Sequence, residues 1–222
     1  MTPNIGHQMN KTKQFRSLLA AVLVLGCVGC HQERPIVKTL TTPPAITPPA
    51  GNSAFLMGQA EGTPGYVCLP TSTGASWTVN ASRPEAVLSA SSSGKDFEIT
   101  HFLSPNANPN PSAPTPLPFG SPTWRSSRDG STVWAKALTP PVASGSDASC
   151  PNTGAIPCLL LETIGSKTGR SGRAGLSETT FIQRLKTNGG AAPAAGCSVS
   201  VDVGKQVLVP YTADYYFFRK DK

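Results

Sequence analysis

Residues 85–102 read EAVLSASSSGKDFEITHF, and two short runs in this stretch decide the fold class. The runs Glu85–Ser89 and Phe97–Phe102 mix apolar and polar residues, and a segment rich in Ser and Gly separates them. Short runs that contain Val, Ile, Phe and Thr and are bounded by turn residues are typical of β-strands. This stretch therefore predicts two strands joined by a turn.

The same pattern continues on both sides of this stretch, with turn signals about every ten residues. No segment keeps a helical apolar period over several turns. The sequence therefore predicts an all-β fold, a single sandwich or barrel-like domain of about ten short strands with disulfides. The expected strands are Ser53–Gln59, Tyr66–Leu69, Ser76–Asn80, Glu85–Ser89, Phe97–Phe102, Thr132–Leu138, Pro157–Ile164, Thr179–Lys186, Gln206–Val209 and Ala213–Arg219.

The composition agrees with one turn-rich domain. The chain has 222 residues, of which 21 are Gly and 22 are Pro, and charged residues make up 14%. The formal net charge is +7. The densest basic segment, GSKTGRSGRAG, carries Lys167, Arg170 and Arg173. A Gly-rich basic loop can hold phosphate or nucleic acid, but we interpret this one as a solvated hairpin tip and expect no nucleic-acid partner.

The first 26 residues have the pattern of an export signal. A short basic segment starts at Met9, which is a better start for a signal than Met1, and the apolar run Ser17–Gly26 follows it. A basic segment followed by a short apolar run is typical of a secretory signal peptide. The run is shorter than the roughly 20 apolar residues that a bilayer span needs, so we expect residues 1–26 to be removed.

Two cysteines follow this apolar run. Val24–Cys27 (VLGC) resembles the bacterial lipobox, in which a cysteine after a small residue is lipidated and becomes the mature N-terminus. We expect lipidation at Cys27, with Cys30 as the alternative. A redox or metal pair is disfavoured because a C-x-x-C redox motif accompanies a βαβ pattern, which is not found here.

The remaining chain divides into a tether and a domain. Residues 27–51 are rich in Pro and Thr, a composition that favours extended polyproline conformation and acts as a spacer. Residues 52–222 form the expected β-rich domain. Within it, residues 104–122 are so rich in Pro that we expect a loop, because Pro removes ladder hydrogen-bond donors.

The domain contains four cysteines, Cys68, Cys150, Cys158 and Cys197. In an exported protein four cysteines indicate two disulfides, with three possible connectivities. Cys150 and Cys158 bracket the turn-rich segment PNTGAIP, which can close locally, and this pairing leaves Cys68 with Cys197. A zinc site is the disfavoured alternative because paired C-x-x-C knuckles are missing, and we expect no metal and no cofactor.

Catalytic signals in the domain are weak. His101 is its single histidine, and Asp129 and Ser131 of RDGSTVW are the candidates to complete a Ser-His-Asp arrangement. The D-G-S sequence is above all a turn signal. The sequence has no G-x-S-x-G, H-E-x-x-H, P-loop or G-x-G-x-x-G motif. We therefore expect a structural His101, and we lean against an enzyme.

The three tryptophans, Trp77, Trp124 and Trp134, are weak candidates for a sugar-binding face. Core packing is the commoner role of tryptophan in a small β domain. In the FIQR run, adjacent strand residues face opposite sides. We therefore predict that Gln183 shares a face with Phe181 and Leu185, and that Arg184 braces a neighbouring loop or acid.

Several motifs together resemble a family of uncharacterised exported proteins of bacteria and fungi, the domain of unknown function 3455. They are GQAEGTPGYVC (Gly58–Cys68), His101, SPTWRSSRDGSTVWA (Ser121–Ala135), TTFIQRLKTNGGAAPAAGC (Thr179–Cys197) and VPYTADYYFF (Val209–Phe218). The resemblance implies an exported β-rich domain without an established activity, and it favours the Cys68–Cys197 disulfide. The Pro-rich insertion after His101 departs from the family's shorter link.

Some fungal members of that family are labelled malate dehydrogenase. This sequence does not support that label, because it has neither a dinucleotide fingerprint nor a βαβ alternation. We expect a lipid-anchored protein of the bacterial cell envelope, on the periplasmic side or the surface, that acts as a binding or structural module. Its expected partners are the membrane, through the anchor, and an envelope glycan or protein. The alternative is an envelope hydrolase that uses His101 with Asp129 or another carboxylate.

Overall fold

The computed structural model describes residues 36–79, 84–104, 120–172 and 174–222. Strands dominate these residues, and short 3-10 helices (η) are the only helices among them. In chain order the elements are η1 (Pro44–Ile46), β1 (Asn52–Gly62), β2 (Gly65–Thr71), β3 (Gly74–Val79), β4 (Pro84–Ser92), β5 (Lys95–Leu103), β6 (Pro122–Ser126), β7 (Thr132–Ala137), β8 (Leu159–Lys167), η2 (Arg170–Gly172), η3 (Gly175–Glu178), β9 (Phe181–Gly189), β10 (Gln206–Leu208) and β11 (Tyr211–Lys220).

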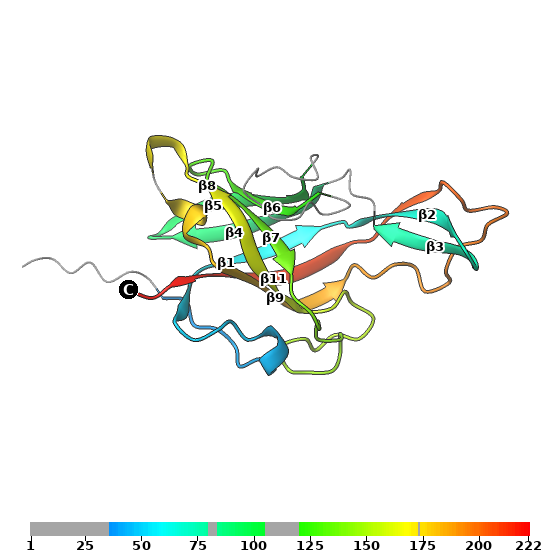
Figure 1. Ribbon diagram of the computed structural model, residues 1–222, viewed down its shortest axis with the longest axis horizontal. Helices are drawn as coiled ribbons and strands as arrows, with labels where there is room; N and C mark the ends of the chain where they lie inside the picture. The colour runs from blue at the N-terminus through cyan, green and yellow to red at the C-terminus, as the bar shows by residue number, and fades with distance from the viewer. Residues whose placement is uncertain (1–35, 80–83, 105–119, 173) are drawn as a thin grey trace, which may run out of the picture. The chain divides into compact units, whose positions relative to one another are not determined.

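Eight of the strands form a closed antiparallel barrel with the order β1-β11-β9-β8-β7-β6-β5-β4 (Figure 1). The barrel closes because β1 pairs with β11 on one side and with β4 on the other. Closure leaves these strands without an unpaired edge. The all-β prediction is confirmed, and of its two architectures the structure has the barrel.

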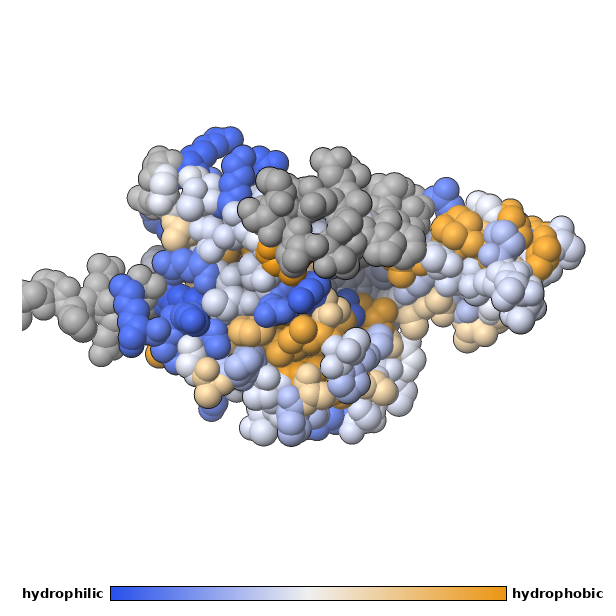
Figure 2. Space-filling view, in the orientation of Figure 1, coloured by the Kyte–Doolittle hydropathy of each residue, from blue (hydrophilic) through white to orange (hydrophobic). Residues whose placement is uncertain are grey.

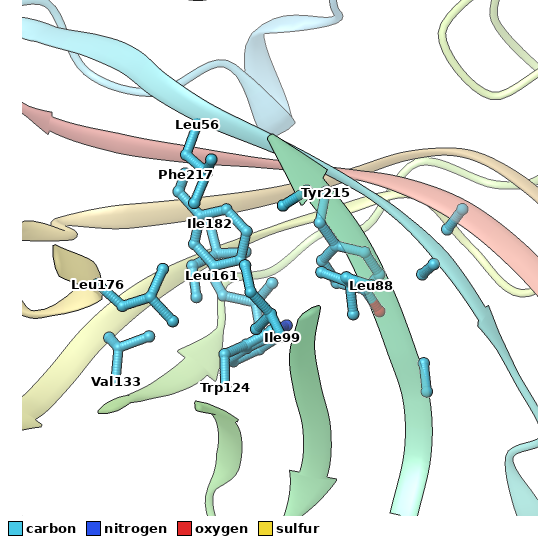
Figure 3. Packing of buried hydrophobic residues seen from close by; sticks show 14 of the residues in the cluster. Leu56, Leu88, Ile99, Trp124, Val133, Leu161, Leu176, Ile182, Tyr215 and Phe217 are labelled. Atoms are coloured by element: carbon cyan, nitrogen blue, oxygen red, sulfur yellow. The ribbon is translucent and has the colours of Figure 1, made fainter. Parts of the chain in front are cut away.

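The interior of the barrel is filled by residues that alternate along each strand. On β11, Tyr215 and Phe217 belong to this barrel core, whereas Tyr216 and Phe218 pack on the outside. This alternation is the two-residue period of a strand. Figure 3 shows Tyr215 and Phe217 together with residues from several other strands, including Trp124 and Ile182, in the same packed cluster.

A second cluster, the outer core, covers the outside of β1, β11, β9 and β8. Its centre is Ile46 of η1, which is fully buried against Leu185 and the Cys150–Cys158 disulfide. The backbone N–H of Val37 also donates to the carbonyl of Ala54. Val37 and Ile46 therefore attach this segment to the barrel, whereas we expected the whole of residues 27–51 to act as a spacer.

The strands β10, β2 and β3 form a separate three-stranded sheet (Figure 1). It is tied together by the Cys68–Cys197 disulfide and by Trp77, whose indole N–H donates to the carbonyl of Gly196 at 2.7 Å. Figure 2 shows hydrophobic surface at this sheet. Its exposed apolar residues are Leu69, Val79 and Leu208, and the segment before β10 adds Val199, Val201 and Val203. Covalent and polar links rather than a large core therefore hold this sheet.

All ten predicted strands are present, with ends that differ by a few residues. The missed strand is β6, a short segment that begins with Pro122 and ends at Ser126, where the SSRDGS turn begins. The predicted Pro-rich loop 104–122 therefore ends earlier than expected, because Pro122 belongs to a strand. Most of that loop, residues 105–119, lies outside the described residues.

Candidate functional site

A pocket of about 200 Å³ opens at one end of the barrel. Phe55 from the start of β1, Phe97 from the start of β5 and Ser92 from the end of β4 line it. Since neighbouring strands are antiparallel, these positions lie at the same end of the barrel. Leu176 of η3 closes one side of the pocket. We call this cavity the mouth pocket.

Two arginines cover the aromatic rings of the mouth pocket. The guanidinium carbon of Arg219 lies 5.0 Å from the ring centroid of Phe55, and that of Arg128 lies 5.7 Å from the ring centroid of Phe97. Both distances are within the range of a cation–π interaction. Arg219 also forms an ion pair with Glu178, with a nitrogen–oxygen distance of 3.3 Å. The mouth pocket therefore combines flat apolar surfaces with charged donors and acceptors.

The Asp129 side chain organises the wall of this pocket. Its Oδ1 accepts hydrogen bonds from the backbone N–H of Ser131 at 2.9 Å and from the Ser131 hydroxyl at 2.6 Å. The Ser131 oxygen in turn accepts from the N–H of Leu176 at 2.9 Å. The N–H of Arg170 donates to the Asp129 carbonyl at 2.7 Å. Asp129 and Ser131 therefore fasten the loop with η2 and η3 onto the β6–β7 turn.

The protonation of Asp129 follows from these contacts. Partial burial raises the pKa of the Asp129 carboxyl, but hydrogen bonds from Ser131 and Ser126 and the nearby charge of Arg128 outweigh burial, so the net pKa is lowered. Asp129 is therefore a carboxylate at neutral pH, engaged in a structural turn. The D-G-S motif has the turn role that its sequence favoured.

His101 lies in the barrel core. Its ring stacks on Trp124 and is tilted against Tyr215, with ring centroids 4.2 Å and 5.6 Å away. Its Nδ1 pairs with the carbonyl of Thr123 at 3.0 Å. Since a carbonyl only accepts, Nδ1 carries the proton in this pair.

The structure therefore brings together two of the three catalytic candidates. Asp129 lines the mouth pocket, and Ser131 bonds to it, whereas His101 is not among the lining residues. The Ser131 hydroxyl donates its proton to Asp129 and accepts from Leu176, so it is not paired with the imidazole that a serine nucleophile needs. This geometry does not support the alternative of an envelope hydrolase built on His101, Asp129 and Ser131.

The three tryptophans do not form one face, so they do not build the shared sugar-binding surface for which they were weak candidates. Trp124 is fully buried in the barrel core. Trp134 is half-buried and pairs with Thr123 and Gly165 across the sheet, while Val133 beside it points inward. Trp77 belongs to the separate three-stranded sheet. Each tryptophan packs in a different layer of the domain.

A family model described as Protein of unknown function (DUF3455) matches residues 49–219 of the chain. The chain belongs to this family. The match includes the barrel strands and the smaller sheet, and it confirms the resemblance that the sequence motifs indicated. No curated protein and no solved structure matched the chain.

Two polar residues on β9 of this DUF3455 domain support neighbouring segments. Gln183 is buried on the outer-core side with Leu185, and its Nε2 donates to the carbonyl of Ile46 at 2.6 Å. Arg184 donates from Nη2 to the carbonyl of Pro157 at 2.9 Å. Gln183 therefore holds the N-terminal segment, and Arg184 braces the loop that precedes β8.

The four cysteines of the DUF3455 domain form the two expected disulfides, Cys68–Cys197 and Cys150–Cys158. This excludes the zinc alternative for these cysteines, because a metal needs free thiolates. In the described ranges no group of three or more His, Cys, Asp or Glu side chains is placed to hold a metal ion. Two disulfides in one domain are typical of exported proteins.

The predicted signal peptide and the lipidation candidates Cys27 and Cys30 lie outside the described residues. Among the residues that are described, no helix has the length and apolar character needed to cross a membrane.

Sequence reasoning did not identify the mouth pocket. Its aromatic and charged residues, among them Phe55, Phe97, Glu178 and Arg219, are spread over most of the domain. The one local signal was the RDGS turn, because it places Arg128 beside Asp129.

Proposed function

We propose that this protein is a lipid-anchored binding module of the bacterial cell envelope that takes a polar ligand, an envelope glycan, at the mouth pocket. The observation that carries the proposal is the pocket itself, where two Arg–Phe pairs and two carboxylates surround a concave surface at one end of the barrel. Binding sites commonly occur in the mouths of β-barrels.

The lining of the pocket suits a glycan. Aromatic residues such as Phe97 line the pocket with apolar surface, while guanidinium and carboxylate groups such as Arg219 and Glu178 can hydrogen-bond to hydroxyl groups. The candidate catalytic residues, in contrast, are committed to structural contacts. Binding without chemistry is therefore the function that this geometry supports best.

The lipobox-like sequence before Cys27 supports the anchor, and the two disulfides support export. In this proposal the lipid holds the domain at the membrane surface. Mass spectrometry of the mature N-terminal peptide tests it: we expect a lipidated Cys27, and a lipidated Cys30 is the alternative. An unmodified mature N-terminus would contradict the anchor.

Binding of the full chain to glycan and peptidoglycan arrays tests the ligand. Ser92→Trp fills the mouth pocket, because Ser92 lines it at the end of β4. Ser91→Trp is the matched control, since Ser91 is exposed and does not line the pocket. We expect array binding that Ser92→Trp abolishes and Ser91→Trp retains. Equal binding by both variants would show that the pocket is not the site.

A further inference from the structure

A second concave surface, the arginine groove, lies beside the mouth pocket. It has a volume of about 290 Å³, and Arg125, Arg128 and Arg170 line it together with Thr100, Ser127 and Gly130. Arg128 and Asp129 line both cavities. A ligand in the mouth pocket can therefore extend into the groove.

The register of the barrel strands explains why cations gather here. Arg125 on β6 lies between Thr100 on β5 and Thr132 on β7. Lys167 on β8 is the next residue in the same row, beyond Thr132. Residues paired in this way share one face of the sheet, so Arg125 and Lys167 both contribute positive charge on the outer side of the barrel.

The third arginine comes from the loop between β8 and β9. The N–H of Arg170 donates to the Asp129 carbonyl, and Gly169 packs so closely on Asp129 that an added Cβ would lie 2.8 Å from its carboxyl carbon. The loop is thus fastened to the groove. The side chains of Lys167 and Arg170 are exposed, in agreement with our interpretation of this basic segment as a solvated tip between two strands.

Within the described part of the chain, the positive charge of the groove is only partly neutralised, by Asp129. There, Arg125, Arg170 and Lys167 have no carboxylate within ion-pair distance, and the ion pairs lie elsewhere, at Lys136–Glu162, Lys205–Asp202 and Arg219–Glu178. Asp129 is the one carboxylate among the lining residues, and its Oδ1 accepts two hydrogen bonds from Ser131. Three guanidinium groups therefore share one carboxylate, which leaves an excess of positive charge in the groove.

Two uncharged hydroxyl groups add hydrogen-bond donors to the arginine groove. Ser127 Oγ accepts a hydrogen bond from the N–H of Glu98 at 3.0 Å, which leaves its own proton to donate. Thr100, which pairs with Arg125 across the sheet, adds a second exposed hydroxyl. The groove thus presents donors to a ligand with several acceptor oxygens.

We propose that the arginine groove binds the phosphate group of a phosphorylated envelope ligand. Guanidinium groups bind phosphate through paired hydrogen bonds, and a phosphate monoester carries close to two negative charges with three acceptor oxygens. A single carboxylate would leave more of the positive charge uncompensated. The proposal rests on the proposed binding function, since it names the charged part of the ligand whose remainder occupies the mouth pocket.

The phosphate has two sources in an envelope, a phosphorylated glycan and a lipid headgroup. Glucose 1-phosphate, with glucose as its uncharged control, probes the first in calorimetric titrations of the full chain. Vesicles of phosphatidic acid, with phosphatidylcholine vesicles as the control, probe the second by co-sedimentation. Binding to either phosphate probe and not to its control supports the proposal and identifies the source.

The double variant Arg125→Gln/Arg170→Gln tests whether the groove is the site. We expect it to weaken binding of the phosphate probe at least about tenfold, since it removes two charge-assisted contacts. The control Lys38→Gln/Lys205→Gln removes the same charge from residues that do not line the groove, and its affinity stays within about twofold of wild type. Circular dichroism confirms that both variants fold.

Three results would overturn the proposal: no saturable binding of either phosphate probe, equal binding of phosphatidylcholine vesicles, or equal loss of affinity in the two double variants. The array experiment separates this failure from that of the proposed function. If Ser92→Trp abolishes array binding and neither phosphate probe binds, the proposed function stands. Only the assignment of a phosphate to the arginine groove is then wrong.

Discussion

The imidazole of His101 lies parallel to the indole of Trp124, with ring centroids 4.2 Å apart and an interplanar angle of 6°. Both side chains are buried in the barrel core, where Tyr215 contacts each of them. The domain's single histidine therefore acts as an aromatic core residue. Its burial agrees with the structural role that the sequence favoured for His101.

A first prediction separates packing from chemistry at His101. His101→Ala removes the stacked ring, and we expect it to lower the free energy of unfolding by about 2–4 kcal/mol. His101→Phe keeps a ring of similar size, and we expect a loss below about 2 kcal/mol, which includes the hydrogen bond to Thr123. Urea denaturation measures both. If His101→Phe folds normally but loses array binding, the core role assigned to His101 is wrong.

A second prediction concerns pH and two aspartates with opposite shifts. The pKa of Asp129 is lowered, because hydrogen bonds from Ser131 and the charge of Arg128 outweigh its partial burial. Its contribution to stability is therefore fully present above the unfolded pKa of about 4 and is lost as the pH falls through the folded value. We expect Asp129→Asn to lower Tm at pH 7, with a smaller difference from wild type as the pH falls below about 4.

The pKa of Asp214 is shifted in the opposite direction to that of Asp129. Burial raises its pKa, and the charge of Lys186 offsets this only in part. The Asp214 carboxylate therefore disfavours folding above its folded pKa, and this penalty disappears as the pH falls through that value. We expect Asp214→Asn to raise Tm at pH 7 and to lose this advantage in acid. Thermal melts between pH 3 and 7 test the pair, and shifts of the same sign in the two variants would contradict the assignment.

A third prediction uses two glycines of the loop beside the mouth pocket. Gly175 has φ +46°, and an added Cβ would collide with Asp129 Oδ2 and lie 2.5 Å from Ser131 Oγ. Gly172 has φ +68°, but an added Cβ would meet nothing within 4 Å. Both alanine variants pay for the left-handed backbone, about 1 kcal/mol. We expect Gly175→Ala to lose at least about 1 kcal/mol more of the free energy of unfolding than Gly172→Ala. Urea denaturation measures both losses. Equal losses would show that the close packing of Gly175 on Asp129 and Ser131 is unimportant.

The sequence predicts the strands of this domain well, because a local pattern of apolar residues and turn residues marks most of them. The β4 and β5 runs, for example, lie between turn residues that end them. The short strand β6 was not predicted, since Pro122 at its start has the composition of the preceding Pro-rich loop. Closure of the barrel could not be predicted, because it depends on β1 pairing with both β4 and β11, and no local pattern encodes a pairing over that distance.

The candidate site was less predictable for a similar reason. Phe55 and Arg219 meet across the β1–β11 pair, at opposite ends of the domain sequence. The face on which each tryptophan lies could not be predicted, because alternation assigns a face only once the sheet is known. Trp124 points inward, while Trp134, on the neighbouring strand, does not. The Asp129 turn could be read from the sequence, since its hydrogen bonds join neighbouring residues.

A last prediction tests the attachment of the N-terminal segment. Gln183 Nε2 donates to the Ile46 carbonyl at 2.6 Å and to Thr42 Oγ1 at 3.3 Å. Gln183→Leu keeps the side-chain volume but leaves that buried carbonyl without this donor, which costs about 1–3 kcal/mol. We expect faster tryptic cleavage after Lys38, because the segment detaches more often. Gln59→Leu is the control, since Gln59 is exposed on β1, and unchanged cleavage in Gln183→Leu would show that packing of Ile46 alone holds the segment.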